Sequence, residues 1–253
     1  MLLDSHVHVG YYSRKGCGGP FYYSPKRIMG VLNRCGVDEF IVSSTCAQVA
    51  EIGIKELIRE AKEMKRLAGH RAHIFFWLSG HLYDEDPTMG WFSTGLFAGI
   101  KLHEMETPWM QKRRDNLERI LSFAEEHGFP IMFHAGPIDG CRPLQLTKLA
   151  NKFPSIHFNF AHCRPMDEMA RVIADCPNVW TDTAYMELNE FSELCNYGWH
   201  GRLMFGTDLP VWQACGACSL TKRYSEYVQS YRASGLESVM SAAFREFVMG
   251  DRP

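Results

Sequence analysis

Two histidines near the start of the chain are the first residues whose spacing indicates chemistry. They lie two positions apart in the apolar run Leu3-Asp4-Ser5-His6-Val7-His8, which is typical of a β-strand. Because side chains along a strand alternate between its two faces, His6 and His8 should point the same way, above Leu2 and Asp4. Neutral imidazole is the commonest nitrogen ligand of zinc-like ions. The pair therefore indicates half of a transition-metal site, although a surface strand can also carry two histidines by chance.

Three further apolar segments end in a residue that could bind a metal. They are 131–134, 158–162 and 204–208, which end in His134, His162 and Asp208. Taken singly, a histidine at a strand end is more often structural, and an aspartate before Leu-Pro is a common turn opener. The spacing from His134 to His162 is close to one strand–helix–strand unit of about 30 residues. We therefore expect these residues, with His6 and His8, to meet in one metal site.

The rest of the sequence predicts the elements that would position these residues. Strand-like segments alternate with helix-like ones, a pattern that favours a parallel sheet covered by helices. Eight strands without an interrupting linker fit a single (β/α)8 TIM barrel over residues 1–253, a fold of about 250 residues with its active site at the C-terminal strand ends. The competing doubly wound sheet usually has a glycine-rich phosphate loop after its first strand, which this sequence lacks. The predicted strands are at about 2–8, 38–44, 72–79, 97–103, 130–135, 156–162, 178–183 and 202–207.

Local signals mark the ends of two of the predicted helices. Ser24 followed by Pro25 is typical of an N-cap with a proline in the first turn. Asp115 with Glu118 three residues later predicts an aspartate form of the capping box. Gly128 then indicates the C-terminal end of that second helix.

Composition excludes several classes of function. The chain has 253 residues and a formal net charge of −2, which argues against binding a nucleic-acid backbone. Nine cysteines without a framework spacing suggest reduced thiols, and no segment resembles a signal peptide or a membrane span. Cys215 and Cys218 have dithiol spacing, but a structural zinc site needs four ligands and no second pair exists, so we interpret them as free thiols. We expect a cytoplasmic protein that binds neither nucleic acid nor membrane.

Taken together, the motifs resemble the amidohydrolase superfamily, in particular the branch shared by small metal-dependent hydrolases and non-oxidative decarboxylases. The matching pieces run through the whole chain in the expected order. The resemblance implies that His6, His8, His134 and Asp208 bind a metal, with His162 beside it as a ligand or a polarising group. It also suggests a homodimer. The pieces are Asp4-Ser5-His6-Val7-His8, Gly99-Ile100-Lys101-Leu102-His103, the strands that end at His134 and His162, and Phe205-Gly206-Thr207-Asp208-Leu209-Pro210.

The chemical form of Lys101 determines whether the site binds one metal ion or two. Lys101 shares a strand face with His103, so both side chains should point into the barrel. In two-metal relatives a lysine at this strand is carboxylated and bridges the ions, whereas in one-metal relatives the position is an ordinary cation. We favour one divalent ion, Zn²⁺, because nothing else in the chain clearly enlarges the ligand set. His103 then contacts the substrate and not the metal.

This ligand set is suited to hydrolysis. Water on such an ion has a pKa near 7, so hydroxide is available at neutral pH. Asp208 is the best candidate for the general base, and His162 or Lys101 could stabilise an oxyanion. We therefore expect hydrolysis of an amide, ester or lactone. The same ligands would serve a non-oxidative decarboxylase of aromatic or unsaturated acids; a metal-dependent phosphoesterase and a barrel that binds without turnover are the remaining alternatives.

Loops after the strands should contact the substrate, which we expect to be a small anionic molecule. The segment 10–23 carries aromatic and cationic side chains, among them Tyr12 and Arg14, and Arg14 could bind a carboxylate through two hydrogen bonds. The alternative is a solvated loop whose tyrosines pack on the rim. Trp109, in the segment 104–114, is expected to form another wall of the site.

Overall fold

A computed structural model describes residues 1–12, 21–211 and 220–250. Its strands form one sheet in the order β2-β1-β3-β4-β5-β6-β7-β8-β9. β2 is antiparallel to β1, and every other neighbouring pair is parallel. The strands are β1 (Leu3–Tyr12), β2 (Phe21–Tyr23), β3 (Glu39–Ser44), β4 (Ala72–Trp77), β5 (Gly99–Leu102), β6 (Ile131–His134), β7 (Phe158–Ala161), β8 (Val179–Asp182) and β9 (Leu203–Met204).

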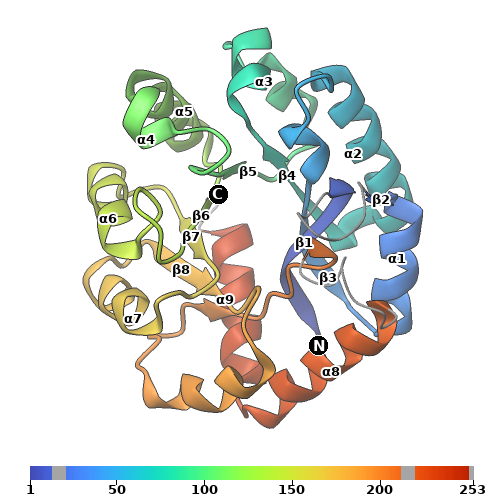
Figure 1. The fold of residues 1–253 in the computed structure, drawn as a ribbon, viewed down its shortest axis with the longest axis vertical. Helices are drawn as coiled ribbons and strands as arrows, with labels where there is room; N and C mark the ends of the chain where they lie inside the picture. Colours follow the sequence, from blue (N-terminus) through green and yellow to red (C-terminus); the bar gives the residue numbers. More distant parts are fainter. Residues whose placement is uncertain (13–20, 212–219, 251–253) are drawn as a thin grey trace.

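Helices follow the parallel strands and surround the curled sheet (Figure 1). The last helix, α9, departs from this pattern because it packs against β9 and β1 nearer the middle of the molecule (Figure 1). None of the described helices is both long enough and apolar enough to cross a bilayer. The helices are α1 (Pro25–Arg34), α2 (Ile54–Ala68), α3 (Gly80–Glu85), α4 (Trp109–Lys112), α5 (Arg114–His127), α6 (Pro143–Lys152), α7 (Met166–Asp175), α8 (Leu220–Ala233) and α9 (Glu237–Met249).

The predicted α/β class is confirmed, and each of the eight predicted segments overlaps a parallel strand, although β1 extends four residues beyond its predicted end, to Tyr12. Residues that follow β9 also reach β1: the Ser5 N–H donates to the Phe205 carbonyl at 2.8 Å, and the His8 N–H donates to the Leu209 carbonyl at 2.6 Å. The sheet itself is an open series from β2 to β9, so the closed (β/α)8 barrel stays a prediction. These hydrogen bonds nevertheless bring the two ends of the parallel series together.

Two groups of buried apolar residues stabilise the sheet, one on each face. The larger group lies between the strands and the surrounding helices, where Val7 and Val9 of β1 pack. The smaller group takes one residue from each parallel strand except β5, among them Phe75 and Met132, and packs them against Phe244 and Phe247 of α9. Helix α9 therefore covers the inner face of the sheet, away from the C-terminal strand ends.

The register of β1 corrects one detail of the sequence analysis. Leu3, and not Leu2, lies in the inner apolar group, whereas Leu2 packs with the outer one. The pairing of β1 with β3 shifts register between Asp4 and Val7, and such an irregularity reverses the alternation of faces. His6 and His8 still point the same way because both lie beyond the point where the shift begins.

The first loop and one helix start also differ from the prediction. The segment 10–23 is partly regular, because Tyr11 pairs with Tyr22 in the antiparallel β1–β2 ladder. Helix α5 begins at Arg114, with Arg113 in the cap position, so Asp115 does not cap it. Glu118 instead forms an ion pair with the ammonium of Lys152 at 2.7 Å. The caps expected at Ser24 and Gly128 are confirmed, since Ser24 Oγ accepts from the Arg27 N–H and Gly128 has a left-handed φ of 66°.

Candidate metal centre

Three side chains from the two ends of the parallel series converge beyond the strand ends. His6 and His8 come from β1, and Asp208 follows β9. The Oδ1 atom of Asp208 lies 3.0 Å from His8 Nε2 and 3.6 Å from His6 Nε2. The three residues are buried, and each offers one ligand atom within 4.8 Å of the other two. We call His6, His8 and Asp208 the metal triad.

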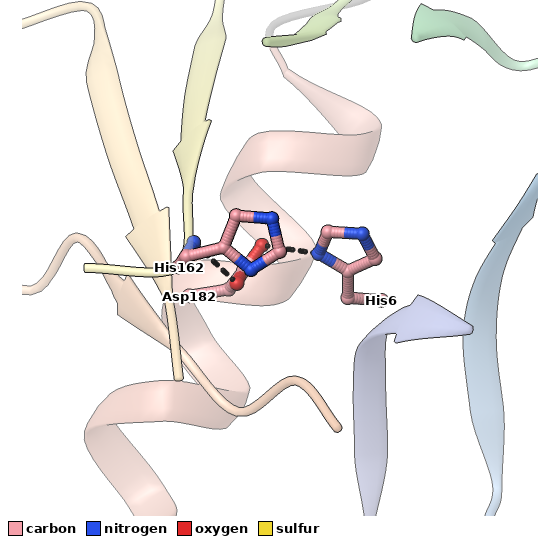
Figure 2. A group of neighbouring side chains, drawn as sticks. All are labelled: His6, His162 and Asp182. Atoms are coloured by element: carbon pink, nitrogen blue, oxygen red, sulfur yellow. Dashed lines mark hydrogen bonds and ion pairs between the residues drawn. The ribbon is translucent and has the colours of Figure 1, made fainter. Parts of the chain in front are cut away.

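The second nitrogen of each triad histidine is held by an oxygen atom outside the triad. His6 Nδ1 lies 3.1 Å from Asp182 Oδ2 (Figure 2), and His8 Nδ1 lies 3.2 Å from the Ser43 carbonyl. A carboxylate or a carbonyl can only accept, so the contacts with Asp182 and with the Ser43 carbonyl favour a proton on Nδ1 of each ring. The Ser43 hydroxyl, 3.0 Å from His8 Nδ1, can accept from the same proton. Both Nε2 lone pairs are then directed at the centre, which is the orientation of metal-binding histidines. The donor set of two neutral imidazoles and one carboxylate fits a divalent transition ion.

Asp182, at the end of β8, is a site residue that the sequence analysis missed. It is fully buried, and besides His6 it accepts from Asn159 Nδ2 at 2.7 Å and from the backbone N–H groups of His162 and Ala184, both at 3.0 Å. Burial by itself raises the pKa of Asp182, but the hydrogen bonds from His6 and Asn159 outweigh it and hold that pKa well below its ordinary value. An ionised Asp182 orients both His6 and the start of the loop after β7.

His162 connects the triad to the other predicted ligand, His134. With His6 and Asp182 it forms a second group of potential ligands within 4.8 Å (Figure 2). Its Nδ1 atom lies 3.1 Å from the Ala184 carbonyl, and its Nε2 atom lies 2.9 Å from His134 Nδ1. His134 is half-buried and belongs to neither ligand group found among the described residues. His162 thus lies between His134 and the triad, and the role of His134 as a ligand stays a prediction.

The backbone beneath two of these side chains is strained. His162 has φ 78° and Asp208 has φ 57°, a left-handed conformation that few non-glycine residues adopt. Each strained N–H donates a hydrogen bond: His162 to Asp182, and Asp208 to the His6 carbonyl at 2.8 Å. Strain of this kind persists where the surroundings fix the backbone, and it is concentrated at functional sites. Gly206 allows the close approach, because a Cβ there would lie 3.1 Å from the Cβ of His6 and 3.2 Å from that of Asp182.

Lys101 is directed at the same centre. Its Nζ atom lies 2.6 Å from His6 Nε2 and 3.2 Å from His8 Nε2, and 4.6 Å from the centre of the Trp77 ring. Burial lowers the pKa of Lys101 to about 8, against the opposing charges of Asp208 and Asp182. The ammonium hydrogens therefore occupy the Nε2 lone pairs that an ion would need. Binding of a cation here requires Lys101 to release a proton or to move aside.

The buried carboxylate of Asp4 connects the backbone segment that carries His6 with the one that carries Asp208. Asp4 accepts from the His6 N–H at 3.0 Å, from Thr207 Oγ1 at 2.7 Å and from the Tyr224 hydroxyl at 2.7 Å. Thr207 directly precedes Asp208, so one side chain fixes the backbone on both sides of the centre. Burial raises the pKa of Asp4 to about 6 in spite of these hydrogen bonds.

The predicted substrate contacts lie at different distances from the centre. His103 stacks on His134 with ring centroids 3.9 Å apart, and its Nδ1 atom is buried without a hydrogen-bond partner among the described residues. Trp109 is fully buried with its ring edge-on to Tyr83, so the structure does not bring it to the triad. Tyr12 lies half-buried at the end of β1. Arg14, like Cys215 and Cys218, lies outside the described residues.

Because His8 and His162 are neutral in the folded protein, we predict that the metal-free protein loses stability in acid. Burial is the largest cause that lowers the pKa of His8 and of His162 to about 3, whereas the value is about 6.5 in an unfolded chain. Between these values the unfolded state binds more protons, so the free energy of unfolding should fall as the pH is lowered from about 6.5. Each group contributes up to about 1.4 kcal/mol per pH unit, while Asp4 acts in the opposite sense between its unfolded and folded pKa values.

Urea unfolding of the metal-free protein at pH 7 and pH 5 measures this effect. The wild-type protein should be less stable at pH 5, and His162→Gln should reduce the difference between the two pH values. His127→Gln, at an exposed helix end, is the matched control and should leave the difference unchanged. Equal stability at both pH values would show that these histidines do not stay neutral in the folded protein.

Comparisons with known proteins agree with this architecture. The family model described as amidohydrolase matches residues 88–220, more than half of the chain. No curated protein matches the sequence.

Solved structures with 15% identity or less share the fold over nearly the whole chain. A Pseudomonas putida protein assigned as a 2-pyrone-4,6-dicarboxylic acid hydrolase has 15% identity and a TM-score of 0.68, with 99% of this chain and 98% of that chain covered. An Acinetobacter baumannii protein with the same assignment, with citric acid bound, has 11% identity and a TM-score of 0.65, with coverage of 98% and 99%. The apo form of Metarhizium anisopliae IDCase, a decarboxylase, has 12% identity and a TM-score of 0.61, with coverage of 99% and 95%.

Proposed function

Because this chain belongs to the amidohydrolase family, we propose that it is a metal-dependent hydrolase whose ion is held by His6, His8 and Asp208. The observation that supports this proposal most directly is the convergence of two Nε2 lone pairs and one carboxylate oxygen at buried positions. His162 is placed beside this triad, where it completes the ligand set or polarises the substrate. The substrate class is a small amide, ester or lactone that carries negative charge.

The residues of the centre can perform different steps of a hydrolysis reaction. A bound divalent ion would act as a Lewis acid toward the substrate carbonyl and would acidify an attacking water. Burial raises the pKa of Asp208, but the neighbouring His6, His8 and His162 hold it below the ordinary value, so the carboxylate is ionised. It can therefore accept the proton of that water and return it to the leaving group. Lys101 or His162 can donate to the oxyanion that develops at the carbonyl. Asp182 orients His6 throughout.

Decarboxylation is the second candidate, and one comparison favours it. The Metarhizium decarboxylase shares the fold over 99% of this chain. The same triad could bind the carboxylate of an aromatic or unsaturated acid beside an electron-withdrawing group, and the loss of carbon dioxide requires no attacking water. Release of carbon dioxide from such acids, measured beside lactone and ester hydrolysis, separates the two reactions.

Elemental analysis of the purified protein tests the metal directly. We expect about one equivalent of a divalent ion per chain, with Zn²⁺ as the ion that restores activity after removal by a chelator. The double variant His6→Gln/His8→Gln should lose the ion, whereas His200→Gln, at an exposed turn, should retain it. Two equivalents would indicate a carboxylated Lys101 and a two-metal site. A folded protein that retains no ion after loading would refute the proposal.

A further inference from the structure

Arg164 lies beside the centre, two residues beyond His162. Its guanidinium carbon lies 4.8 Å from the centre of the Tyr185 ring, and that ring is edge-on to His162 with centroids 6.5 Å apart. Arg164 follows β7 and Tyr185 follows β8, so both belong to the loops at the C-terminal strand ends. Both side chains are half-buried. The shared contact with Tyr185 places Arg164 near His162.

The Arg164 side chain has no acidic partner among residues 1–12, 21–211 and 220–250. Its Nε atom is buried without a hydrogen-bond partner there, and no ion pair between described residues includes it. A buried guanidinium N–H that is left without an acceptor is costly, so it requires an acceptor from outside the chain, such as a water, an ion or a ligand. Other arginines near the rim are paired: Arg142 contacts Glu168, and Arg113 contacts Asp84. Arg164 differs from them in having no acidic partner among the described residues, while its guanidinium lies on Tyr185 next to His162.

We propose that Arg164 binds a carboxylate of the substrate. This inference rests on the proposed function and specifies the substrate as a carboxylic acid whose reacting carbonyl lies a few bonds from the acid group. Stacking on Tyr185 holds the guanidinium plane, and a guanidinium held in this way can donate two parallel hydrogen bonds to a carboxylate. The contact also neutralises a positive charge beside a centre that would gain further positive charge from an ion. Lysine, with a single compact ammonium, cannot reproduce the paired geometry.

Isothermal titration of the zinc-loaded protein with isophthalate tests the proposal. This planar acid carries two carboxylates too far apart to chelate one ion together, so one can meet the metal triad while the other meets Arg164. Monomethyl isophthalate lacks the second charge and serves as the matched ligand. The wild-type protein should prefer the diacid by about 10- to 100-fold, the range expected for a charge-assisted pair of hydrogen bonds. Arg164→Met should abolish the preference, and Arg164→Lys should restore it in part.

Arg245→Met is the matched control variant. Arg245 pairs with Glu39 at the opposite ends of the strands, so its loss should leave the preference for the diacid intact. Equal binding of the diacid by wild-type protein and Arg164→Met, or no binding by the wild-type protein, overturns the proposal. Zinc content measured on the same samples separates the two hypotheses. Retained zinc without discrimination refutes the role of Arg164 alone, whereas protein that retains no zinc refutes the metal centre.

Discussion

Asp208→Asn should lower kcat for hydrolysis by about 10²- to 10⁴-fold, the range over which a positioned general base contributes. Asparagine preserves the size of the side chain and one oxygen ligand near His8, which lies 3.0 Å from Asp208 Oδ1. It cannot accept a proton from water, so the proton transfer is lost while most of the geometry remains. Steady-state kinetics with an ester or lactone substrate, together with zinc content, measure the effect.

Zinc content determines how this result is interpreted. A variant that retains zinc and loses turnover supports the base, whereas one that loses both shows that Asp208 acts chiefly as a ligand. Asp167→Asn is the matched control, because Asp167 is exposed in the first turn of α7 and should change neither quantity. Asp208→Asn with undiminished hydrolysis and bound zinc would refute the assignment.

The positions of the strands could be predicted well from the sequence, because alternating strands and helices are a strong periodic signal. The convergence of His6 and His8 with Asp208 followed from the same reasoning, since the ends of parallel strands meet at one edge. The register shift in β1 could not be predicted, because it reverses the alternation over only a few residues and leaves no mark in residue type. For that reason the sequence analysis places Leu2 on the inner face of the sheet, where the structure has Leu3.

Two side-chain assignments show where the pattern of residue types is insufficient. Trp109 was expected to form a wall because aromatic residues in rim loops often do, yet it lies fully buried against Tyr83. Asp182 was overlooked although it ends a predicted strand as His134 does. Attention to carboxylates at every strand end would have found it, but its four hydrogen bonds depend on residues from β1, β7 and the loops after β7 and β8.

The second large effect is expected from Asp182→Ala, which should weaken zinc binding by about 10- to 100-fold. Removal of this carboxylate leaves His6 Nδ1 without its acceptor, so the ring can rotate or exchange its tautomer, and Nε2 is no longer held toward the centre. The His162 N–H and Asn159 amide lose their acceptor as well, and each buried unpaired donor costs about 1–3 kcal/mol of folding stability.

Competition with a chromogenic chelator measures the zinc dissociation constant, and urea unfolding measures the accompanying loss of stability. Asn159→Ala is the informative control, because Asn159 donates to Asp182 without touching His6. It should lower stability while weakening zinc binding much less than Asp182→Ala does. If both variants weakened zinc binding equally, the effect would come from general loosening of the β7–β8 region. An effect confined to Asp182→Ala would instead show that orientation of His6 controls the affinity, since the two variants disturb the same buried network and differ in their contact with that imidazole.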